Sequence, residues 1–588
     1  MSTVPVIRRG TEGHWINPEK PAMAGAQATP LCEKSEHGWR RREPSMSAWM
    51  SLWLLVIGIC QGSRGLSQPV FSNALKLGTV AVPGLNQASG VVSSRNNDAV
   101  LWTHNDSGDV PRIFAIDTQG RHLGTYRLAG ATHVDYEDIA IGPGPVPNVT
   151  YLYVGDIGDN KSVRTGIQVY RIPEPAVYLR QASAPPTADL KGLVAIPLRY
   201  PDGPHNAETL LIDPLTGDLF VITKQPGIAG IYRASRSQLN EAGVVGLTRV
   251  GEIPFNVANG GDTSPNGREI IIRQEDFARL WTRTSHQSVM EALLSTPTAI
   301  PVVGRPTEPN GEAIGFDRFG SGYFTLSDGA ATQPLYYFPR ANAPSIKTPH
   351  TLVAAAGSWR YLDNGSAPGS GWRTNGFDDK AWRSGEAQFG YGDGDEQTVV
   401  SYGMDGNAKH LTTYFRTTFV VTKLPDSFRL ELRLLFNDGA AVFLNGALVA
   451  LENLTNDPTS LTLAFKPRAA LEDAWAVYEI DPAPLLGGTN TLAIEIHLSD
   501  AARPHLSLDA QLLATEFRPM KITSLTKLRD GQPQLHMESD LPELTVEATT
   551  NWTTWISLGG VSLTNGNGTF DLPRSPVGPH QFFRLRSQ

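Results

Sequence analysis

The sequence predicts an all-β fold that begins with a five-bladed β-propeller. Between residues 86 and 337, a polar or acidic cluster leads five times into an apolar strand, which two further strands follow. A repeat of about 50 residues built from short strands is typical of propeller blades. The 57 glycines, the 43 prolines and a charged content of only 18% fit many strands joined by turns. Length and composition together favour several β-domains in one chain.

The copies of the repeat are recognised by their openings. The clearest openings are residues 135–139, 206–210 and 310–314. A fourth copy opens at 259–262, and the most divergent copy opens at 86–90. Since blades repeat around a central channel, each opening is expected to begin the innermost strand of a blade.

Four antiparallel strands are expected in each blade, counted from the channel outwards. The strands expected for blades one to four are 89–93, 99–104, 113–117 and 123–128; 137–141, 151–156, 167–172 and 192–198; 208–212, 219–223, 230–233 and 246–253; and 262–264, 269–273, 279–282 and 298–303. Short apolar runs bounded by turn residues indicate these strands.

The fifth blade lacks a fourth strand of its own. Its expected strands are 312–316, 322–326 and 335–338, and an unassigned strand over 75–82 precedes blade one. We expect this N-terminal strand to complete blade five, because such closure removes exposed sheet edges. The predicted propeller then covers residues 73–340. A six-bladed ring with one degenerate blade is the alternative.

Two smaller β-domains are predicted after the propeller, over residues 351–516 and 520–588. In the first, Asn445 and Gly446 separate two apolar strands and predict a two-residue hairpin turn. Aromatic residues of this domain could form either its core or an exposed carbohydrate platform, and aromatic residues in strands usually belong to the core. These residues are Trp359, Trp372, Trp382, Tyr391 and Tyr414.

Residues 1–67 are predicted to be an N-terminal extension with a signal peptide. An apolar core over 51–60 follows the basic run 40–42, and small or polar residues come next. This core is shorter than the roughly 20 residues that span a bilayer. A secreted, periplasmic or cell-surface protein is therefore expected, with an uncleaved anchor as the alternative. Both cysteines, Cys32 and Cys60, lie here, which excludes cysteine chemistry from the predicted domains.

The charge and the motifs of the chain exclude several classes of function. The net charge of −8 argues against nucleic-acid binding, which favours a basic face. The sequence contains no G-x-S-x-G nucleophile elbow, no H-E-x-x-H zinc motif and no Walker phosphate loop. A monomer is expected, and contact with a membrane is expected only through an uncleaved N-terminal segment.

Four acidic residues at the strand openings are the predicted metal ligands. They are Glu137, Glu208, Asp262 and Glu312, which we expect at equivalent places around the channel mouth. Carboxylates gathered in one place repel one another unless a cation intervenes. Oxygen ligands with few nitrogens suit Ca²⁺ best. The alternative is that these acids only bond backbone amides in turns.

The same face of the propeller is predicted to hold ligand-binding and catalytic candidates. The loops between the second and third strands bring the predicted ligand-binding residues there: His104, Asp106, Asp156, Asp159, Asp276 and Asp328. His133, Asp135 and His205 are candidates for proton transfer, since histidine and carboxylate side chains titrate near neutral pH in such settings. The residues alone identify no catalytic group among them.

Three segments carry a resemblance to a known group of proteins. Residues 101–109, 135–140 and 153–160 resemble those of bacterial secreted β-propeller proteins of largely unassigned function. More distantly, the region is similar to phytase-like and esterase-like propellers that hold calcium. This resemblance covers about 260 residues, and it implies a fold and a face without implying a reaction.

The two smaller domains carry resemblances of their own. Residues 351–516 resemble galactose-binding-like jelly rolls through a Trp–Asp–Trp and an Asp-Gly…Leu-Asn-Gly pattern. That resemblance implies a small Ca²⁺ site marked by Asp393, Asp395 and Asp438. Strands expected near residues 544, 555 and 582, with turn residues between them, predict a small immunoglobulin-like or fibronectin-like sandwich over residues 520–588. Through residues 546–549 and 583–585, this part of the chain resembles C-terminal modules of secreted bacterial proteins.

Three hypotheses of function follow from these patterns. The first is a secreted multidomain protein that binds a small molecule or a glycan, with an acidic, Ca²⁺-binding propeller face. The second is a metal-dependent phosphoesterase or esterase at the channel mouth. The third is a structural or adhesive surface protein. The second ranks below the first, because the nearest cations that could hold phosphate are few: Lys161, Arg164, Lys224 and Arg273.

Overall fold

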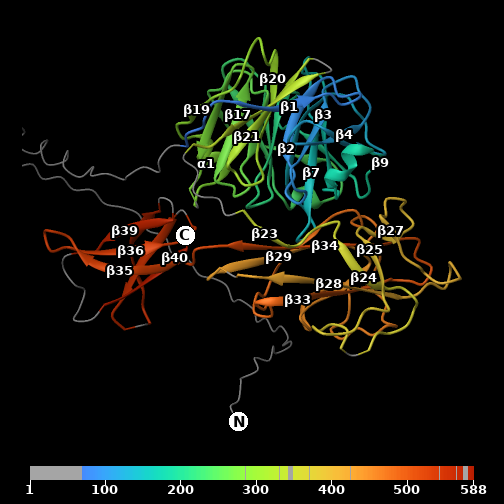
Figure 1. The fold of residues 1–588 in the computed structure, drawn as a ribbon. Coiled ribbons are helices and arrows are strands. Elements are labelled where there is room, and N and C mark those ends of the chain that lie inside the picture. Colours follow the sequence, from blue (N-terminus) through green and yellow to red (C-terminus); the bar gives the residue numbers. More distant parts are fainter. Residues whose placement is uncertain are drawn as a thin grey trace, which may run out of the picture. The chain divides into compact units, whose positions relative to one another are not determined.

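The computed structural model shows an all-β chain (Figure 1). It describes residues 69–284, 286–329, 332–341, 348–369, 371–423, 425–541, 543–551, 553–563, 566–573 and 581–587. The predicted signal peptide and both cysteines lie outside the described residues. The described helices are short: α1 (Val289–Leu293) and the 3₁₀ turns η1 (Leu179–Ser183) and η2 (Gln238–Asn240). None of these described helices is long and apolar enough to cross a membrane.

Residues 75–339 form five antiparallel-based sheets, coloured blue to yellow-green in Figure 1, which we call the five-sheet region. Sheet 1 consists of β2 (Ala88–Ser93), β3 (Val100–Asn105), β4 (Arg112–Asp117), β5 (His122–Arg127) and β9 (Thr187–Asp189). Sheet 2 consists of β6 (Tyr136–Pro143), β7 (Thr150–Asp156), β8 (Ile167–Pro173), β10 (Val194–Arg199) and β14 (Val245–Gly246). The strands expected from the sequence are confirmed, with small changes at their ends.

In the remaining three sheets of this region, strands that follow one another in sequence are again neighbours in the sheet. Sheet 3 consists of β11 (Ala207–Ile212), β12 (Leu219–Thr223), β13 (Ala229–Ala234) and β15 (Thr248–Ile253). Sheet 4 consists of β16 (Gly260–Thr263), β17 (Glu269–Gln274), β18 (Phe277–Thr282) and β19 (Thr298–Ile300). Sheet 5 consists of β20 (Asn310–Phe316), β21 (Gly322–Asp328), β22 (Gln333–Pro339) and β1 (Leu75–Val80). The N-terminal strand therefore pairs with β22, as its position in the sequence led us to expect.

The first strands of the five sheets pack against one another. They contact in the order β2, β6, β11, β16, β20 and back to β2. Glycines allow this close approach: a Cβ on Gly315 of β20 would lie 2.2 Å from the Val91 carbonyl oxygen of β2. A Cβ on Gly260 of β16 would lie 2.6 Å from the Glu312 carbonyl oxygen of β20. Neither position can carry a side chain without moving the backbone.

Two buried carboxylates join these first strands. Asp138 of β6 accepts hydrogen bonds from the backbone N–H groups of Leu210 in β11 (2.9 Å) and Gly261 in β16 (3.2 Å). Asp262 of β16 accepts one from the N–H group of Phe316 in β20 (2.9 Å). Buried amides need partners, and here a carboxyl group from another sheet supplies each one. We call Asp138 and Asp262 the latch residues.

Residues 350–516 form two sheets that share one hydrophobic core, and we call them the two-sheet region. The first sheet consists of β23 (His350–Val353), β26 (Phe389–Tyr391), β27 (Thr398–Val399), β29 (Phe428–Asn437), β32 (Ala476–Ile480) and β34 (Leu506–Glu516). The second consists of β24 (Ser358–Leu362), β25 (Arg383–Glu386), β28 (Thr412–Val421), β30 (Gly439–Leu444), β31 (Ala447–Glu452) and β33 (Gly488–His497). Asn445 and Gly446 form the predicted turn, both with positive φ.

The aromatic side chains of the two-sheet region belong to its interior. All five that the sequence singled out are buried: Trp359, Trp372, Trp382, Tyr391 and Tyr414. The prediction that they form the core is confirmed. These five side chains therefore provide no exposed platform on which a sugar ring could stack.

The C-terminal residues form two three-stranded sheets around a small core of their own. One sheet consists of β35 (Lys521–Lys527), β36 (Pro533–Glu538) and β39 (Asn567–Asp571). The other consists of β37 (Glu543–Thr549), β38 (Ile556–Ser562) and β40 (Phe582–Ser587). The strands that the sequence predicts near residues 544, 555 and 582 are confirmed.

The latch residues generate a prediction about stability. Changing Asp138 to Asn keeps the size of the side chain but replaces an acceptor oxygen by an N–H donor that faces backbone donors. We expect the free energy of unfolding to fall by about 1–3 kcal/mol, because buried backbone N–H groups lose an acceptor oxygen and face a donor instead. Urea denaturation measures the change. The matched control is Asp189→Asn at an exposed ion pair with Arg127, which should leave stability unchanged; equal effects of both changes would contradict the latch.

Candidate functional site

Three glutamates occupy the same structural position at the start of three first strands. Glu137 lies in β6, Glu208 in β11 and Glu312 in β20. Each is the one residue skipped between two paired neighbours of its strand, so each sits in a β-bulge. Bulges redirect a side chain away from the regular ladder and are common next to functional sites. The three carboxyl groups affect one another electrostatically, so the predicted gathering of these glutamates is observed.

Asp262 does not join the three glutamates, which corrects its predicted equivalence with them. It pairs with Ile271 in a ladder that has no bulge. Its carboxylate is buried and accepts the N–H groups of Phe316 (2.9 Å) and Thr263 (2.8 Å). The ladder of β16 is regular, and the Asp262 side chain bonds the backbone of β20. Asp262 is a latch residue with no described place among the clustered carboxylates.

Two aspartates complete the gathering of carboxylates. One oxygen from each of Asp106, Asp135 and Glu137 lies within 4.8 Å of the other two. Glu137 is only 3% exposed, and its carboxylate receives no hydrogen bond from any residue that the structure describes. The name acidic cluster is used below for five residues: Asp106, Asp135, Glu137, Glu208 and Glu312.

Burial shifts the titration of the three glutamates upward. Burial, and then the charge of Glu208, raise the pKa of Glu312 to about 8. Burial raises the pKa of Glu208 to about 7, although Lys224 opposes the shift. The pKa of Glu137 lies well above its ordinary range, because of burial first and the Glu208 carboxylate second. Protons therefore remain on part of this cluster at neutral pH.

The aspartates and Lys224 set the remaining charge of the site. Burial, and then Asp106, raise the pKa of Asp135 to about 6. Lys224 forms an ion pair with Glu208. Burial disfavours the Lys224 ammonium, but Glu208, Glu312 and Glu137 together outweigh that effect and raise the pKa of Lys224. One ammonium cannot neutralise five carboxyl groups, so the site gathers oxygen atoms of the kind that hard cations prefer.

Two of the predicted histidines lie near the acidic cluster. His104 is fully buried, its Nδ1 lies 2.9 Å from the Asn105 carbonyl oxygen, and its Nε2 has no partner in the described chain. Burial lowers the pKa of His104 to about 4, so the ring is neutral at neutral pH. His133 stacks on Tyr136 with ring centroids 3.9 Å apart. Both rings are positioned as neighbours of the carboxylates, and neither donates a hydrogen bond to them in the described structure.

Two predicted ligand-binding residues instead hold the loops of the site. Asp156 accepts the N–H groups of Val134 and Asp135, each at 3.2 Å, and forms an ion pair with Arg164 at 2.8 Å. Asp159 accepts the backbone N–H group of Arg164 at 2.7 Å. Asp156 therefore positions Asp135, and its own oxygens are already engaged.

Three further candidates lie in different surroundings. His205 is held by Asp202 and by the Tyr232 hydroxyl, both 3.0 Å from Nε2. Asp276 is exposed and forms an ion pair with Arg305. Asp328 is buried beside the acidic cluster, where its charge raises the pKa of Glu312. Of these three, only Asp328 is electrostatically coupled to the cluster.

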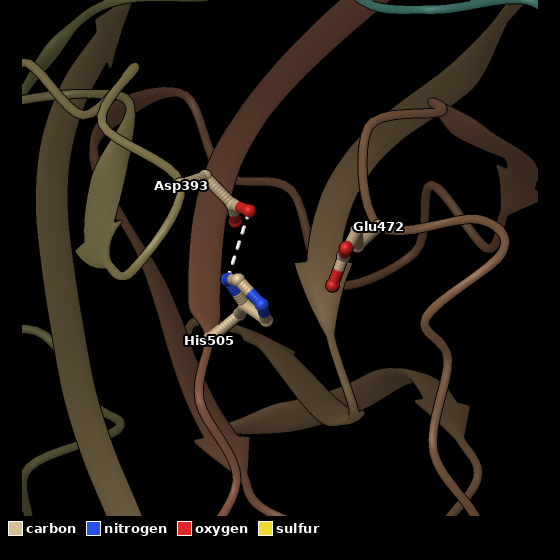
Figure 2. Close-up of side chains that lie close together, drawn as sticks. All are labelled: Asp393, Glu472 and His505. Atoms are coloured by element: carbon tan, nitrogen blue, oxygen red, sulfur yellow. Dashed lines mark ion pairs between the residues drawn. The ribbon is translucent and has the colours of Figure 1, made fainter. Parts of the chain in front are cut away.

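A second polar cluster, which the sequence pattern did not reveal as a whole, lies in the two-sheet region. His505 Nδ1 is 2.8 Å from an Asp393 oxygen, and Figure 2 shows Glu472 opposite this pair. Lys191 of the five-sheet region extends its Nζ to within 2.8 Å of Asp393 and 2.6 Å of Glu472. These residues are far apart in sequence, so no local signal could have assembled them. The lysine ammonium makes this cluster an ionic junction between the two regions.

Asp438, the third member of the Ca²⁺ site implied by resemblance, does not join Asp393. It is fully buried and accepts the Ser499 hydroxyl at 2.6 Å, the Arg468 N–H group at 2.9 Å and Arg503 Nε at 3.0 Å. Asp438 is therefore fully engaged in holding loops of the two-sheet region.

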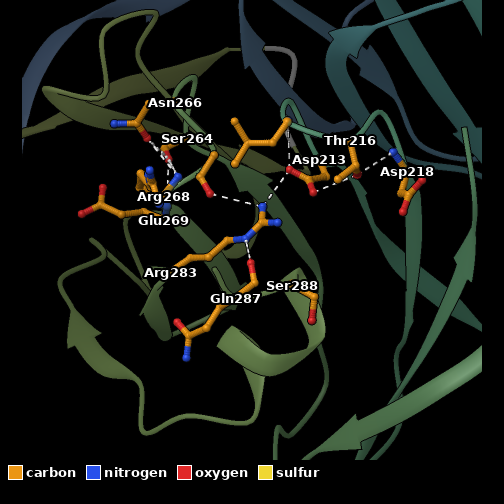
Figure 3. A network of polar contacts seen from close by, with 12 residues as sticks. Asp213, Thr216, Asp218, Ser264, Asn266, Arg268, Glu269, Arg283, Gln287 and Ser288 are labelled. Carbon is orange, nitrogen blue, oxygen red and sulfur yellow. Dashed lines mark hydrogen bonds and ion pairs between the residues drawn. The ribbon is translucent and has the colours of Figure 1, made fainter. Parts of the chain in front are cut away.

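A third polar network joins sheets 3 and 4 (Figure 3). Arg283 donates to Asp213 Oδ1 at 2.8 Å and to the Gln287 carbonyl oxygen at 2.5 Å. Asp213 also accepts the Thr216 hydroxyl at 2.9 Å. Arg283 and Asp213 therefore satisfy each other, and this buried pair explains how the two sheets are held together here.

Comparisons with known proteins assign the chain to no family. No family model matches the chain, and no curated protein matches it either. Similar solved structures include a beta-glycosidase from Bacteroides vulgatus, with 14% identity and a TM-score of 0.19 over 40% of this chain and 32% of that chain. An uncultured Clostridium sp. beta-glucuronidase has 11% identity and a TM-score of 0.21 over 41% of this chain and 43% of that chain.

The Ruminococcus gnavus beta-glucuronidase in complex with uronic isofagomine is similar to the same degree. It has 11% identity and a TM-score of 0.22 over 41% of each chain. The chain thus spans less than half the length of each of these three structures. At these TM-scores the likeness carries no argument, and the function has to be inferred from the residues of this chain.

The raised pKa of Glu312 generates a prediction about pH. Its ordinary pKa is 4.5 and its folded value is about 8, so between these values the folded chain keeps a proton that the unfolded chain has lost. Stability must then fall as the pH rises through this window. Glu312→Gln cannot ionise, and we expect it to gain about 1–3 kcal/mol relative to wild type between about pH 5 and pH 8 in chelator.

Urea denaturation at the two pH values tests this prediction. The exposed Glu386→Gln is the matched control and should follow the wild-type pH dependence. A parallel pH dependence for wild type and Glu312→Gln would contradict the buried, proton-retaining Glu312.

The ionic junction around Lys191 generates a further prediction. Lys191→Met removes the ammonium while keeping a long apolar side chain. It leaves Asp393 with only the His505 ring and Glu472 without a cationic partner among the described residues. We expect a loss of about 1–2 kcal/mol, moderated by the partial exposure of Lys191 to solvent. Thermal unfolding measures it, with the exposed Lys380→Met as control. An unchanged midpoint for Lys191→Met would show that the junction adds nothing to stability.

Proposed function

We propose that the five sheets are the blades of a five-bladed β-propeller and that the acidic cluster lies at the mouth of its channel. The cyclic contacts of the first strands and the pairing of β1 with β22 support this arrangement. The equivalent bulges of Glu137, Glu208 and Glu312 support a common mouth, because equivalent positions of different blades converge there. In the same proposal, the two-sheet region is a galactose-binding-like jelly roll and the last domain an immunoglobulin-like sandwich.

The proposed function is cation-dependent ligand binding, with Asp106, Asp135 and Glu137 as the ligands of a Ca²⁺ ion. The observation that carries this is the Glu137 carboxylate, which is nine-tenths buried, lacks a hydrogen-bond donor and lies close to two other carboxylates. Burying an unpaired carboxylate is costly. A divalent cation would compensate all three carboxylates at once.

The chemistry of the donors favours calcium over a transition metal. The three candidate ligands offer only oxygen atoms, and His104 turns its Nδ1 toward a backbone carbonyl oxygen. Oxygen-only sites suit Ca²⁺, which accepts six to eight ligands in variable geometry. Three carboxylates leave coordination positions to be filled by other oxygens, including hydroxyl groups of a bound ligand.

A hydroxyl-bearing ligand such as a glycan fits this site better than a phosphate ester. Lys224 is already paired with Glu208, and Arg164 is paired with Asp156, so neither is free to hold phosphate. No activated nucleophile is positioned beside the cluster in the described chain. We therefore propose a secreted or surface-exposed binding protein, whose smaller β-domains extend its contacts.

Calcium titration of the full chain tests this function. We expect Ca²⁺ at about 100 times its Kd to raise the thermal midpoint by about 5–10 °C, and chelator to reverse the rise. Glu137→Gln should abolish most of this stabilisation, because it removes the central carboxylate charge. Asp276→Asn, at an exposed ion pair, is the matched control and should respond as wild type does.

Two outcomes would overturn the proposal. One is a wild-type midpoint that does not respond to Ca²⁺. The other is an equal response in Glu137→Gln, which would place the cation elsewhere. Isothermal titration calorimetry of the same variants distinguishes loss of binding from loss of folding.

A further inference from the structure

A pocket separate from the acidic cluster lies beside sheet 2. Its volume is about 250 Å³, and the ends of β8 and β10 and the segment before β6 line it. We call it the Arg199 pocket. The lining residues that matter below are Arg199, Arg164, Gln168, Thr165, Val134 and Val244. The volume lies just under the roughly 300–1,000 Å³ of sites for drug-sized ligands, so it suits a ligand of one ring.

The Arg199 pocket is lined by two arginines and one aspartate, so it carries one positive charge in excess. Arg164 forms an ion pair with Asp156 at 2.8 Å and donates to the Gly158 carbonyl oxygen at 2.7 Å. Arg199 is exposed and has no acidic partner within the described chain. Since the charges of Arg164 and Asp156 neutralise each other, Arg199 contributes the one remaining positive charge of the pocket.

The remaining walls combine polar groups with exposed apolar surface. The Gln168 amide and the Thr165 hydroxyl have no hydrogen-bond partner in the part of the chain that the structure describes. Val134 and Val244 line the same pocket and are 55% and 57% exposed. Sugar rings present hydroxyl groups at their rim and C–H groups on their faces, and such a mixed wall matches both.

We propose that the Arg199 pocket binds a sugar acid, with the ligand carboxylate on the Arg199 guanidinium. A guanidinium binds a carboxylate through two parallel hydrogen bonds. One positive charge matches a monoanion, and the nearby Asp156 disfavours a dianion such as phosphate. The hydroxyl groups of the ring then face Gln168 and Thr165, and its apolar face lies on the two valines.

Asp156 positions residues of both the Arg199 pocket and the acidic cluster, although the two sites attract ligands of opposite charge. Asp156 accepts the N–H groups of both Val134, a wall of the pocket, and Asp135, a member of the cluster. The same carboxylate therefore orders two neighbouring sites. Because the pocket is cationic and the cluster is anionic, the inferred carboxylate site stands whether or not the cluster takes Ca²⁺.

Titration of the full chain with D-glucuronate and D-glucose tests the pocket. The two probes differ in the carboxylate, so we expect saturable glucuronate binding and glucose binding at least about tenfold weaker. Arg199→Ala should weaken glucuronate binding by at least about tenfold. Arg127→Ala removes an exposed arginine elsewhere and should bind as wild type does. Ligand-observed NMR or calorimetry measures the affinities.

Three outcomes would overturn the inference. They are an absence of saturable glucuronate binding, equal affinities for the two sugars, and unchanged binding by Arg199→Ala. Tighter binding of inorganic phosphate than of glucuronate would overturn the assignment to a carboxylate. An unchanged thermal midpoint verifies that Arg199→Ala is folded, and retained glucuronate binding by Glu137→Gln separates this site from the proposed cation site.

Discussion

The structure of the five-sheet region depends on how the buried backbone amides of its first strands find acceptors. These strands pack against one another in a ring of contacts, where no further strand can pair with them. Asp138 supplies one carboxylate to amides of two other sheets, and Asp262 supplies another to β20. Each of these two buried carboxyl groups accepts backbone N–H groups from strands of other sheets, so these two acids hold the first strands together.

One member of the acidic cluster, Glu137, lies one residue before the latch residue Asp138. In β6, Glu137 sits in a bulge directly before Asp138. Asp138 accepts backbone N–H groups, whereas the Glu137 carboxyl group accepts none among the described residues. The same bulge recurs at Glu208 and Glu312. In each of the three strands, the bulge turns the glutamate side chain out of the regular alternation.

Compensation of charge distinguishes the structural polar groups of this chain from those inferred to bind ligands. Lys191 enters a cluster of carboxylates and joins two regions. Arg283 and Asp213 satisfy each other between two sheets. Glu137 and Arg199, in contrast, lack partners in the described chain. Asp156 lines the Arg199 pocket and accepts the N–H group of Asp135 in the acidic cluster, so the two inferred sites share one supporting residue.

The sequence by itself determined the strands and their grouping into five similar sets, because apolar runs and turn residues are local signals. It also predicted the pairing of the N-terminal strand, because the fifth set lacks a fourth strand and one strand before the first set was unassigned. It also placed Glu137, Glu208 and Glu312 at equivalent openings. Only the tertiary structure decided that Asp262 is a latch, since a bulge is a difference in register that no residue type specifies. Only the tertiary structure could show that Lys191 is compensated and Arg199 is not, because charge balance depends on partners far away in the chain.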